Sequence, residues 1–216
     1  VVETVQGEGG INVASVDWLR KLDRLCKEHE IVLIVDDIQA GCGRTGTFFS
    51  FERAGIRPDI VTLSKSIGAY GLPMSLVLIR PDLDVWEPAQ HTGTFRGHNL
   101  AFVAAAAAIR TYWVDRALEK KVRDRARQIE TALDHVITAH PGADFTRRGL
   151  GLLQGLVCAD PALAKQISRE AFARGLIVEC AGAHDEVVKL MPPLTIGEGT
   201  LAKALDIFSH AVAAAI

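Results

Sequence analysis

The pattern of apolar and polar positions in the first 80 residues alternates between a helical period and short continuous apolar runs. Ser15 precedes the helical pattern, so we expect it to cap a helix there. The apolar stripe of that helix consists of Trp18, Leu19, Leu22, Leu25 and Cys26. Three β-rich runs follow, at residues 31–35, 59–63 and 75–79. Such runs are typical of strands buried in a mostly parallel sheet, and their alternation with helical segments favours an α/β fold with crossover helices.

Beyond Asn99 the pattern becomes helical. We expect an alanine-rich helix from there to about Tyr112. A second helix follows, and its predicted buried stripe consists of Leu118, Val122, Ala126, Ile129, Leu133 and Val136. Its other face is rich in lysine and arginine, which we interpret as a solvated surface and not as a binding patch.

Pro141-Gly142 marks an expected domain boundary. Residues 1–140 are predicted to form part of a large α/β domain, and residues 141–216 a small C-terminal α+β domain. The small domain's expected elements are a strand region at 149–157, a helix at 162–174, strands at 176–179 and 187–190, and a closing helix from about Gly197. Residues 1–5 read as a strand already under way, so we expect that the N-terminal portion of the large domain is missing and that the chain is a fragment.

Composition narrows the class of protein. The chain has 216 residues, of which 49% are hydrophobic, and a net charge of −2, which makes a nucleic-acid partner a poor expectation. Its longest apolar stretch, residues 102–109, is too short to span a membrane. The four cysteines form neither a CxxC pair nor a metal-ligand cluster, so we expect reduced thiols, no metal and a cytoplasmic protein.

Two motifs suggest nucleotide chemistry but lack the required context. Residues 41–46 (GCGRTG) match GxGxxG, yet five residues separate them from the preceding strand, whereas a dinucleotide fingerprint turns the strand directly into a helix. Asp36-Asp37 after an apolar run resembles the metal-binding strand of P-loop enzymes, but the chain has no GxxxxGK[ST] segment. Dinucleotide or nucleotide triphosphate binding is therefore not predicted.

Asp36 and Lys65 follow two of the expected strands. Taken alone, Asp36 reads more simply as the cap of a following helix, with Gln39 as its reciprocal partner, and Lys65 as a surface lysine. Together they change the picture, because open α/β sheets bind ligands at the carboxyl ends of their strands. Pyridoxal 5′-phosphate (PLP) requires a carboxylate at its ring nitrogen and a lysine at its aldehyde, and a half-buried Lys65 suits the second role. The polar segment 91–99 can supply phosphate donors.

Four segments carry a resemblance to a known family: 3–10 (ETVQGEGG), 34–46 (IVDDIQAGCGRTG), 59–68 (DIVTLSKSIG) and 93–99 (GTFRGHN). They resemble the class III, or ω-, aminotransferases of PLP fold type I. The resemblance implies that Lys65 is the lysine that bonds to the cofactor and Asp36 the carboxylate at its ring nitrogen. It also implies that Gln39 lies near the cofactor's 3-hydroxyl and that Thr94 reaches the PLP phosphate of a neighbouring subunit, which makes the protein a homodimer or higher homo-oligomer.

The resemblance also implies substrate-lining residues, Glu3 and Glu8. In many relatives the counterpart of Glu8 pairs with an arginine that moves aside for a substrate carboxylate, and Lys189 stands at that position here. The residue sequences of several segments resemble those of relatives that transfer an amino group from glutamate to aspartate 4-semialdehyde, so the resemblance implies this reaction. Three alternatives remain: another ω-aminotransferase acting on ornithine, acetylornithine or 4-aminobutyrate, a PLP aminomutase or racemase, or a non-catalytic truncated relative.

Overall fold

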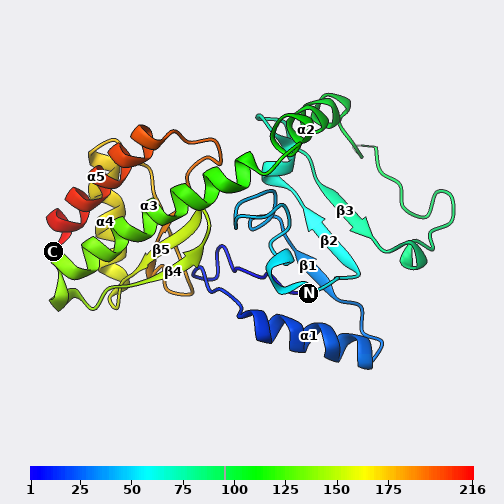
Figure 1. The fold of residues 1–216 in the computed structure, drawn as a ribbon, viewed down its shortest axis with the longest axis horizontal. Coiled ribbons are helices and arrows are strands. Elements are labelled where there is room, and N and C mark those ends of the chain that lie inside the picture. Colours follow the sequence, from blue (N-terminus) through cyan, green and yellow to red (C-terminus); the bar gives the residue numbers. More distant parts are fainter. Residues whose placement is uncertain (95) are drawn as a thin grey trace. The chain divides into compact units, whose positions relative to one another are not determined.

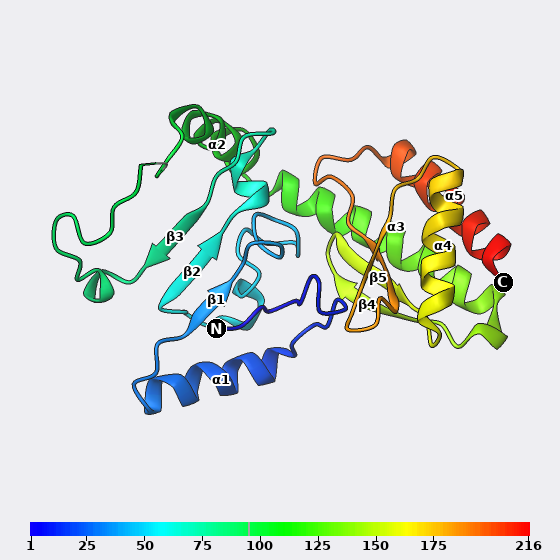
Figure 2. The ribbon, with the colours of Figure 1, turned by 180° about the vertical axis from the view of Figure 1, so that it is seen from behind.

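The computed structural model describes residues 1–94 and 96–216, so Phe95, in the polar segment 93–99, lies outside the described residues. Figures 1 and 2 show the ribbon from opposite sides. The helices are α1 (Val16–Glu28), α2 (Asn99–Tyr112), α3 (Ala117–Ala139), α4 (Pro161–Ala173) and α5 (Glu198–Ala215). The strands are β1 (Ile34–Asp36), β2 (Ile60–Leu63), β3 (Leu76–Ile79), β4 (Thr146–Leu150), β5 (Leu153–Val157), β6 (Glu179–Ala181) and β7 (Val187–Leu190).

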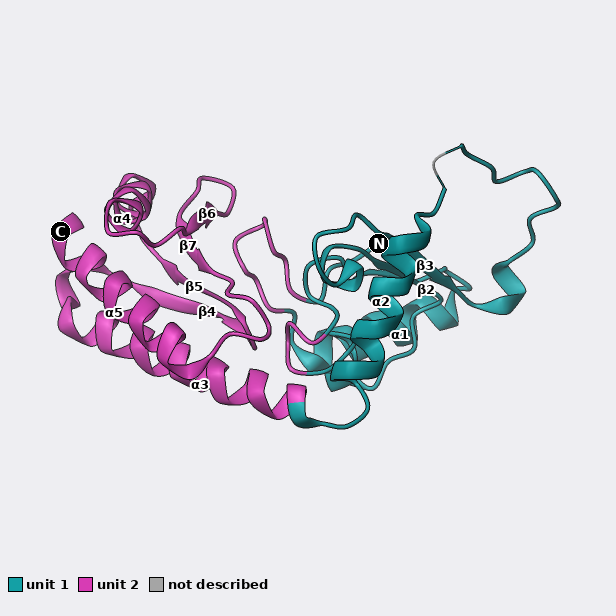
Figure 3. Ribbon diagram, turned by 90° about the horizontal axis from the view of Figure 1, so that it is seen from above, with its two compact units in different colours: residues 1–4, 14–42, 47–117 teal, residues 5–13, 43–46, 118–216 magenta. Residues whose placement is uncertain are grey.

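The chain divides into two compact units, coloured separately in Figure 3. Unit 1 contains residues 1–4, 14–42 and 47–117, and unit 2 contains residues 5–13, 43–46 and 118–216. Most of α3 belongs to unit 2, where the Gln154 side-chain amide donates to the Ala126 carbonyl at 3.0 Å. The expected domains 1–140 and 141–216 stay a prediction.

The sheet of unit 1 has the order β1-β2-β3. β1 and β2 are parallel, whereas β3 runs antiparallel to β2. The backbone of Val2 adds a parallel bridge to β1, and α1 forms the crossover between them. No α-helix links β1 to β2 among the described residues; the glycine-containing loop 37–50 and a short 3-10 turn, Glu52–Ala54, make that connection. The expected alternation of strands with crossover helices therefore holds only for α1.

The local elements of unit 1 follow from the sequence pattern, with shorter strands than expected. Ser15 accepts a hydrogen bond from the Trp18 backbone N–H at 3.2 Å and caps α1 as predicted. Along the apolar stripe of α1, Leu19 and Cys26 are buried, while Trp18 and Leu25 are about half exposed. Only the residues along one line of the helix surface pack on the core. The apolar stripe covers a wider arc of the helix than the surface that α1 contacts in this unit.

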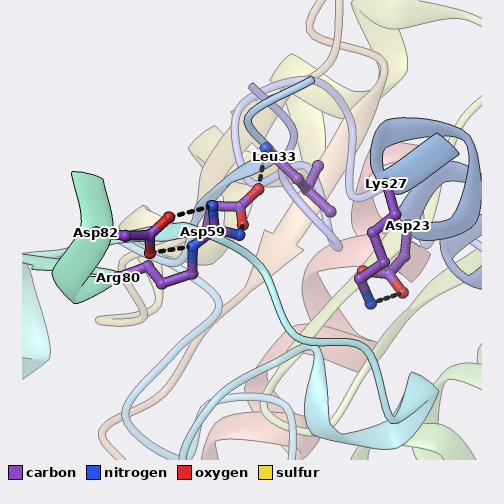
Figure 4. Close-up of polar contacts among 6 residues, drawn as sticks. All are labelled: Asp23, Lys27, Leu33, Asp59, Arg80 and Asp82. Atoms are coloured by element: carbon purple, nitrogen blue, oxygen red, sulfur yellow. Dashed lines mark hydrogen bonds and ion pairs between the residues drawn. The ribbon is translucent and has the colours of Figure 1, made fainter. Parts of the chain in front are cut away.

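A polar cluster fixes the register at the amino end of this sheet (Figure 4). Asp59 accepts a hydrogen bond from the Leu33 N–H at 2.7 Å through one carboxylate oxygen and pairs with Arg80 through the other. Arg80 also forms a two-pronged ion pair with Asp82, at 2.5 and 2.8 Å. Because Asp59 precedes β2 and Arg80 follows β3, this cluster lies at the end of the strands opposite Asp36, and we assign it a structural role.

Unit 2 contains an antiparallel sheet of order β4-β5-β7-β6. α4 contacts β6, β7 and α5. The predicted stripe of α3 is confirmed, since all six of its residues are buried. The start of α5 after Gly197 is also confirmed. The strand expected at 176–179 forms instead at Glu179–Ala181, and Ile177 is largely exposed.

Two further properties concern the whole described chain. None of its described helices is long and apolar enough to cross a membrane. The four cysteines are free thiols, as predicted, and three of them are buried.

Candidate active site

The carboxyl ends of β1 and β2 bring Asp36 and Thr62 into register as direct neighbours. Val2 accepts a hydrogen bond from the Asp36 N–H at 2.8 Å, which places Glu3 at the same edge of the sheet. One carboxylate oxygen of Asp36 accepts the Ile38 N–H at 3.1 Å. Residues 38–45 form turns and no helix starts there, so the interpretation of Asp36 as a helix cap is wrong. Its carboxylate instead forms a local turn and stays half-buried at the strand end.

Lys65 starts a short 3-10 turn, Lys65–Gly68, just after β2. Its backbone φ is +52°, in the left-handed region, where a non-glycine residue carries about 1–3 kcal/mol of strain. The Ser64 hydroxyl donates to the Met74 carbonyl at 2.9 Å and holds the start of the turn. The expectation that Lys65 is half buried is wrong for this chain, because its side chain is exposed. Backbone strain of this kind persists where the surrounding structure fixes the residue and thereby the direction of its side chain.

The loop that follows β1 carries the GxGxxG segment. Its residues are buried but form turns, so the segment does not turn a strand directly into a helix, as a dinucleotide fingerprint would. Gln39 is half-buried in this loop. Cys42 is 6% exposed, and burial, with a smaller effect of Asp37, raises the pKa of its thiol to about 12. Cys42 is therefore a neutral packing residue and not a nucleophile.

Thr94 lies on an exposed loop of unit 1 between β3 and α2. His98, near it in sequence, caps α2 by accepting the Ala101 N–H at 3.3 Å through Nδ1. His91 packs its ring against Trp86, with ring centroids 4.5 Å apart. These contacts give both histidines local structural partners, and no described contact joins them to Thr94.

Unit 2 brings together Glu8 and Lys189. The Lys189 side chain is only 3% exposed, and its Nζ lies 2.8 Å from a Glu8 carboxylate oxygen. A second carboxylate, Glu179 on the neighbouring strand β6, lies 3.3 Å away. Burial acts to lower the pKa of Lys189, but the hydrogen bonds and charges of the two glutamates outweigh it, so the pKa is raised. Lys189 is therefore a charged ammonium held by two carboxylates.

The sequence-predicted residues thus fall into two groups. Glu3, Asp36, Gln39, Lys65 and Thr94 belong to unit 1, and Glu8 and Lys189 belong to unit 2. Sequence reasoning missed Glu179, because its pairing with Lys189 depends on strand register. It also assigned no role to Asp37, although the adjacent acidic pair Asp36-Asp37 was a visible signal.

The donor set of unit 1 fits PLP. A carboxylate on the last residue of β1 and a primary amine just after the adjacent strand β2 supply the two groups that the cofactor's ring nitrogen and aldehyde require. Thr62 Oγ1, in register with Asp36, is buried without a hydrogen-bond partner among the described residues, so its expected partner is a polar group outside them. The described residues contain no cluster of three or more His, Cys, Asp or Glu side chains able to hold a metal ion.

Comparison with known sequences agrees with this chemistry. The family model of Aminotransferase class-III matches residues 1–212. A diaminobutyrate–2-oxoglutarate transaminase of Bordetella parapertussis is 54% identical over 217 residues, covering 100% of this chain and 50% of that protein. A protein of the same name from Nocardia farcinica is 56% identical over 212 residues, covering 98% of this chain and 48% of that protein. The chain spans about half the length of these curated relatives.

Solved structures show the same fold. The ornithine aminotransferase of Toxoplasma gondii, in which PLP partly occupies the active site, matches with a TM-score of 0.90 at 29% identity, covering 99% of this chain and 50% of that one. An acetylornithine aminotransferase from Elizabethkingia anophelis matches with a TM-score of 0.87 at 29% identity, covering 99% of this chain and 56% of that one. The expected fold class is thereby confirmed. Since the family model covers nearly the whole sequence, this chain belongs to the class-III aminotransferases.

Proposed function

We propose that the protein of which this chain forms a part is a PLP-dependent transaminase. It moves an amino group from glutamate to aspartate 4-semialdehyde and yields 2,4-diaminobutyrate and 2-oxoglutarate. The observation that carries this proposal is the identity of 54–56%, over 98–100% of the chain, with relatives named diaminobutyrate–2-oxoglutarate transaminase. The solved ornithine and acetylornithine aminotransferases are more distant, at 29% identity.

In this proposal, PLP supplies an electron sink for the substrate carbon that carries the amino group. Asp36 holds the proton on the ring nitrogen. Lys65 would hold the cofactor's aldehyde through Nζ and, once an amino substrate has displaced it, its freed amine would serve as the base that moves a proton at the substrate carbon. Gln39 would lie near the 3-hydroxyl, and the hydroxyl of Thr94 would donate to the phosphate of the neighbouring subunit's cofactor. The half-buried Asp36 at a strand end and the strained backbone of Lys65 support these assignments.

The Glu8–Lys189–Glu179 cluster is proposed to bind the substrate carboxylate, with Glu3 as a further lining residue. Glu8 is 67% exposed, so its side chain can rotate away and let a substrate carboxylate take its place on Lys189. The lysine offers a point charge in place of the two-pronged guanidinium that many relatives use, which relaxes the geometry required of the incoming carboxylate. Glu179 stays beside the ammonium during the exchange.

We also propose a cytoplasmic homodimer, or a larger homo-oligomer, whose active sites are shared through Thr94. The exposed position of Thr94 on its loop supports this arrangement. On this view, the 216-residue chain alone is inactive.

Borohydride reduction of the complete protein, followed by peptide mapping, tests the cofactor assignment. We expect a pyridoxyl adduct on Lys65 alone, and an adduct on another lysine would refute it. Steady-state rates with diaminobutyrate, ornithine, acetylornithine and 4-aminobutyrate as amino donors to 2-oxoglutarate then separate the proposed substrate from its alternatives. Faster turnover of any of the last three would replace the substrate assignment.

A further inference from the structure

Asp37, the residue after Asp36, is a buried carboxylate with partners of its own. It is 1% exposed. One of its oxygens accepts the Ser50 N–H at 3.0 Å and the other accepts the Ser50 hydroxyl. The Thr4 hydroxyl in turn donates to Ser50 Oγ at 2.5 Å. Thr4 and Ser50 are fully buried, so a closed chain of polar groups runs from Thr4 through Ser50 to Asp37.

The backbone of Asp37 is hydrogen-bonded on both its N–H and its carbonyl. Its N–H donates to the Thr62 carbonyl at 3.0 Å, and its carbonyl accepts the Gly41 N–H at 2.9 Å. A Cβ on Gly41 would lie 2.7 Å from that carbonyl oxygen and 2.8 Å from a carboxylate oxygen, so only glycine fits there. Asp37 therefore closes both ends of the loop 37–50 and ties that loop to the end of β2.

Each segment that meets at Asp37 carries a residue of the proposed site. Thr4 follows Glu3, Asp37 follows Asp36, and the closed loop contains Gln39. We propose that Asp37 is a positioning residue, which sets the carboxylate of Asp36 and the amide of Gln39 for the cofactor through its hydrogen bonds to Ser50 and the Thr4 hydroxyl behind it. This inference rests on the proposed PLP-dependent function.

The charge state of Asp37 agrees with a buried, constrained group. Burial raises its pKa, the two hydrogen bonds from Ser50 oppose that rise, and the nearby Asp36 adds to it. A carboxylate removed from water in this way is retained at a cost in stability, and a purely structural tie could be made by apolar packing. The position next to Asp36 gives it a use that apolar packing would not supply.

The test compares PLP affinity with stability in the complete protein. Asp37→Asn keeps the size of the side chain but places an N–H₂ group against one of the two donors of Ser50. Thr4→Val removes only the outer hydroxyl, and Thr4→Ser restores it. Asp59→Asn is the matched control, because Asp59 also accepts a backbone N–H in unit 1, but at the opposite end of the sheet. The dissociation constant for PLP is measured by fluorescence titration of each apoprotein, and its melting temperature is recorded beside it.

We expect Asp37→Asn to weaken PLP binding roughly 10- to 100-fold, and Thr4→Val by a smaller factor that Thr4→Ser recovers. Asp59→Asn should lower the melting temperature and leave PLP affinity within about threefold. If Asp37→Asn does not fold, the Thr4 pair decides alone. Equal PLP affinities in wild type, Thr4→Val and any folded Asp37→Asn overturn the positioning role, while wild-type PLP binding keeps the proposed function intact. A wild-type protein that binds no PLP overturns both.

Discussion

The turn between β4 and β5 makes the closest backbone approach at a glycine in unit 2, and an added methyl group tests it. Gly151 has φ +62°, and its neighbour Leu152 donates to the Arg44 carbonyl at 2.8 Å. A Cβ on Gly151 would lie 2.3 Å from the Arg44 oxygen and 2.7 Å from the Cα of Thr45. Both neighbours are backbone atoms, so neither can rotate away. We predict that Gly151→Ala forces residues 43–46 away from the turn.

Two terms set the size of the effect. A non-glycine residue in the left-handed region loses about 1–2 kcal/mol. Overpacking against atoms that cannot move adds about 1–3 kcal/mol. Gly151→Ala should therefore reduce the free energy of unfolding by about 2–5 kcal/mol.

Two other glycines separate the terms. Gly175 has φ +85° but no atom within 4 Å of the place where a methyl group would lie, so Gly175→Ala should show the backbone term alone, about 1–2 kcal/mol. Gly142 has open space and no positive φ, so Gly142→Ala should be neutral or stabilise by about 0.4–1 kcal/mol. Urea unfolding of the complete protein gives the three values. If Gly151→Ala is no more destabilising than Gly175→Ala, the close approach of Arg44 to the turn is wrong.

Three further predictions concern the proposed site in the complete protein. Asp36→Asn should keep PLP bound but lower kcat by roughly 100- to 10,000-fold, because the ring nitrogen loses the group that holds its proton; near-normal turnover in a rate assay would contradict this. Thr94→Ala should weaken PLP binding roughly 10- to 100-fold, and mixing it with Lys65→Ala should restore turnover in heterodimers, since one site then carries both lesions and the other neither. Inactive heterodimers would exclude a shared site. Because the pKa of Lys189 is raised from 10.5, its contribution to stability is present below pH 10.5 and is lost as pH rises through the folded-state pKa, so wild type should lose more stability than Lys189→Met in alkaline urea titrations.

Local pattern predicted the helices better than the sheet. The stripe of α3, the cap at Ser15 and the start of α5 after Gly197 depend on residues close in the sequence, which the sequence displays directly. The antiparallel direction of β3 depends on how the chain returns after Lys65, and an apolar run carries no information about direction. The strand expected at 176–179 formed two to three residues later for the same reason, since pairing with β7 selects which residues become strand.

The candidate site shows the same difference between features that depend on local pattern and features that depend on distant contacts. Asp36 and Lys65 could be predicted as site residues because both lie at the ends of apolar runs, and strand ends are readable in a sequence. The exposure of Lys65 was not predicted, because burial depends on contacts with residues distant in sequence or outside this chain. Glu179 and the Ser50–Asp37 bond were missed because a strand register and the closure of a loop create them.

Three of the buried charged side chains among the described residues, Arg44, Asp37 and Lys189, are compensated in different ways. The difference indicates which of them can exchange its partner for a substrate group. Arg44 donates to the carbonyls of Leu152 and Pro192, and burial lowers the pKa of its guanidinium to about 10. Partners that belong to the backbone cannot leave without unfolding their segment, and the same holds for the N–H that Ser50 gives to Asp37. The partners of Lys189 are the side chains of Glu8 and Glu179, 67% and 72% exposed, so water can solvate Glu8 when it moves away while Glu179 stays beside the ammonium. Of these three charges, Lys189 is therefore the one that fits the proposed exchange of a protein carboxylate for that of a substrate, whereas the partners of Arg44 and Asp37 hold backbone segments in place.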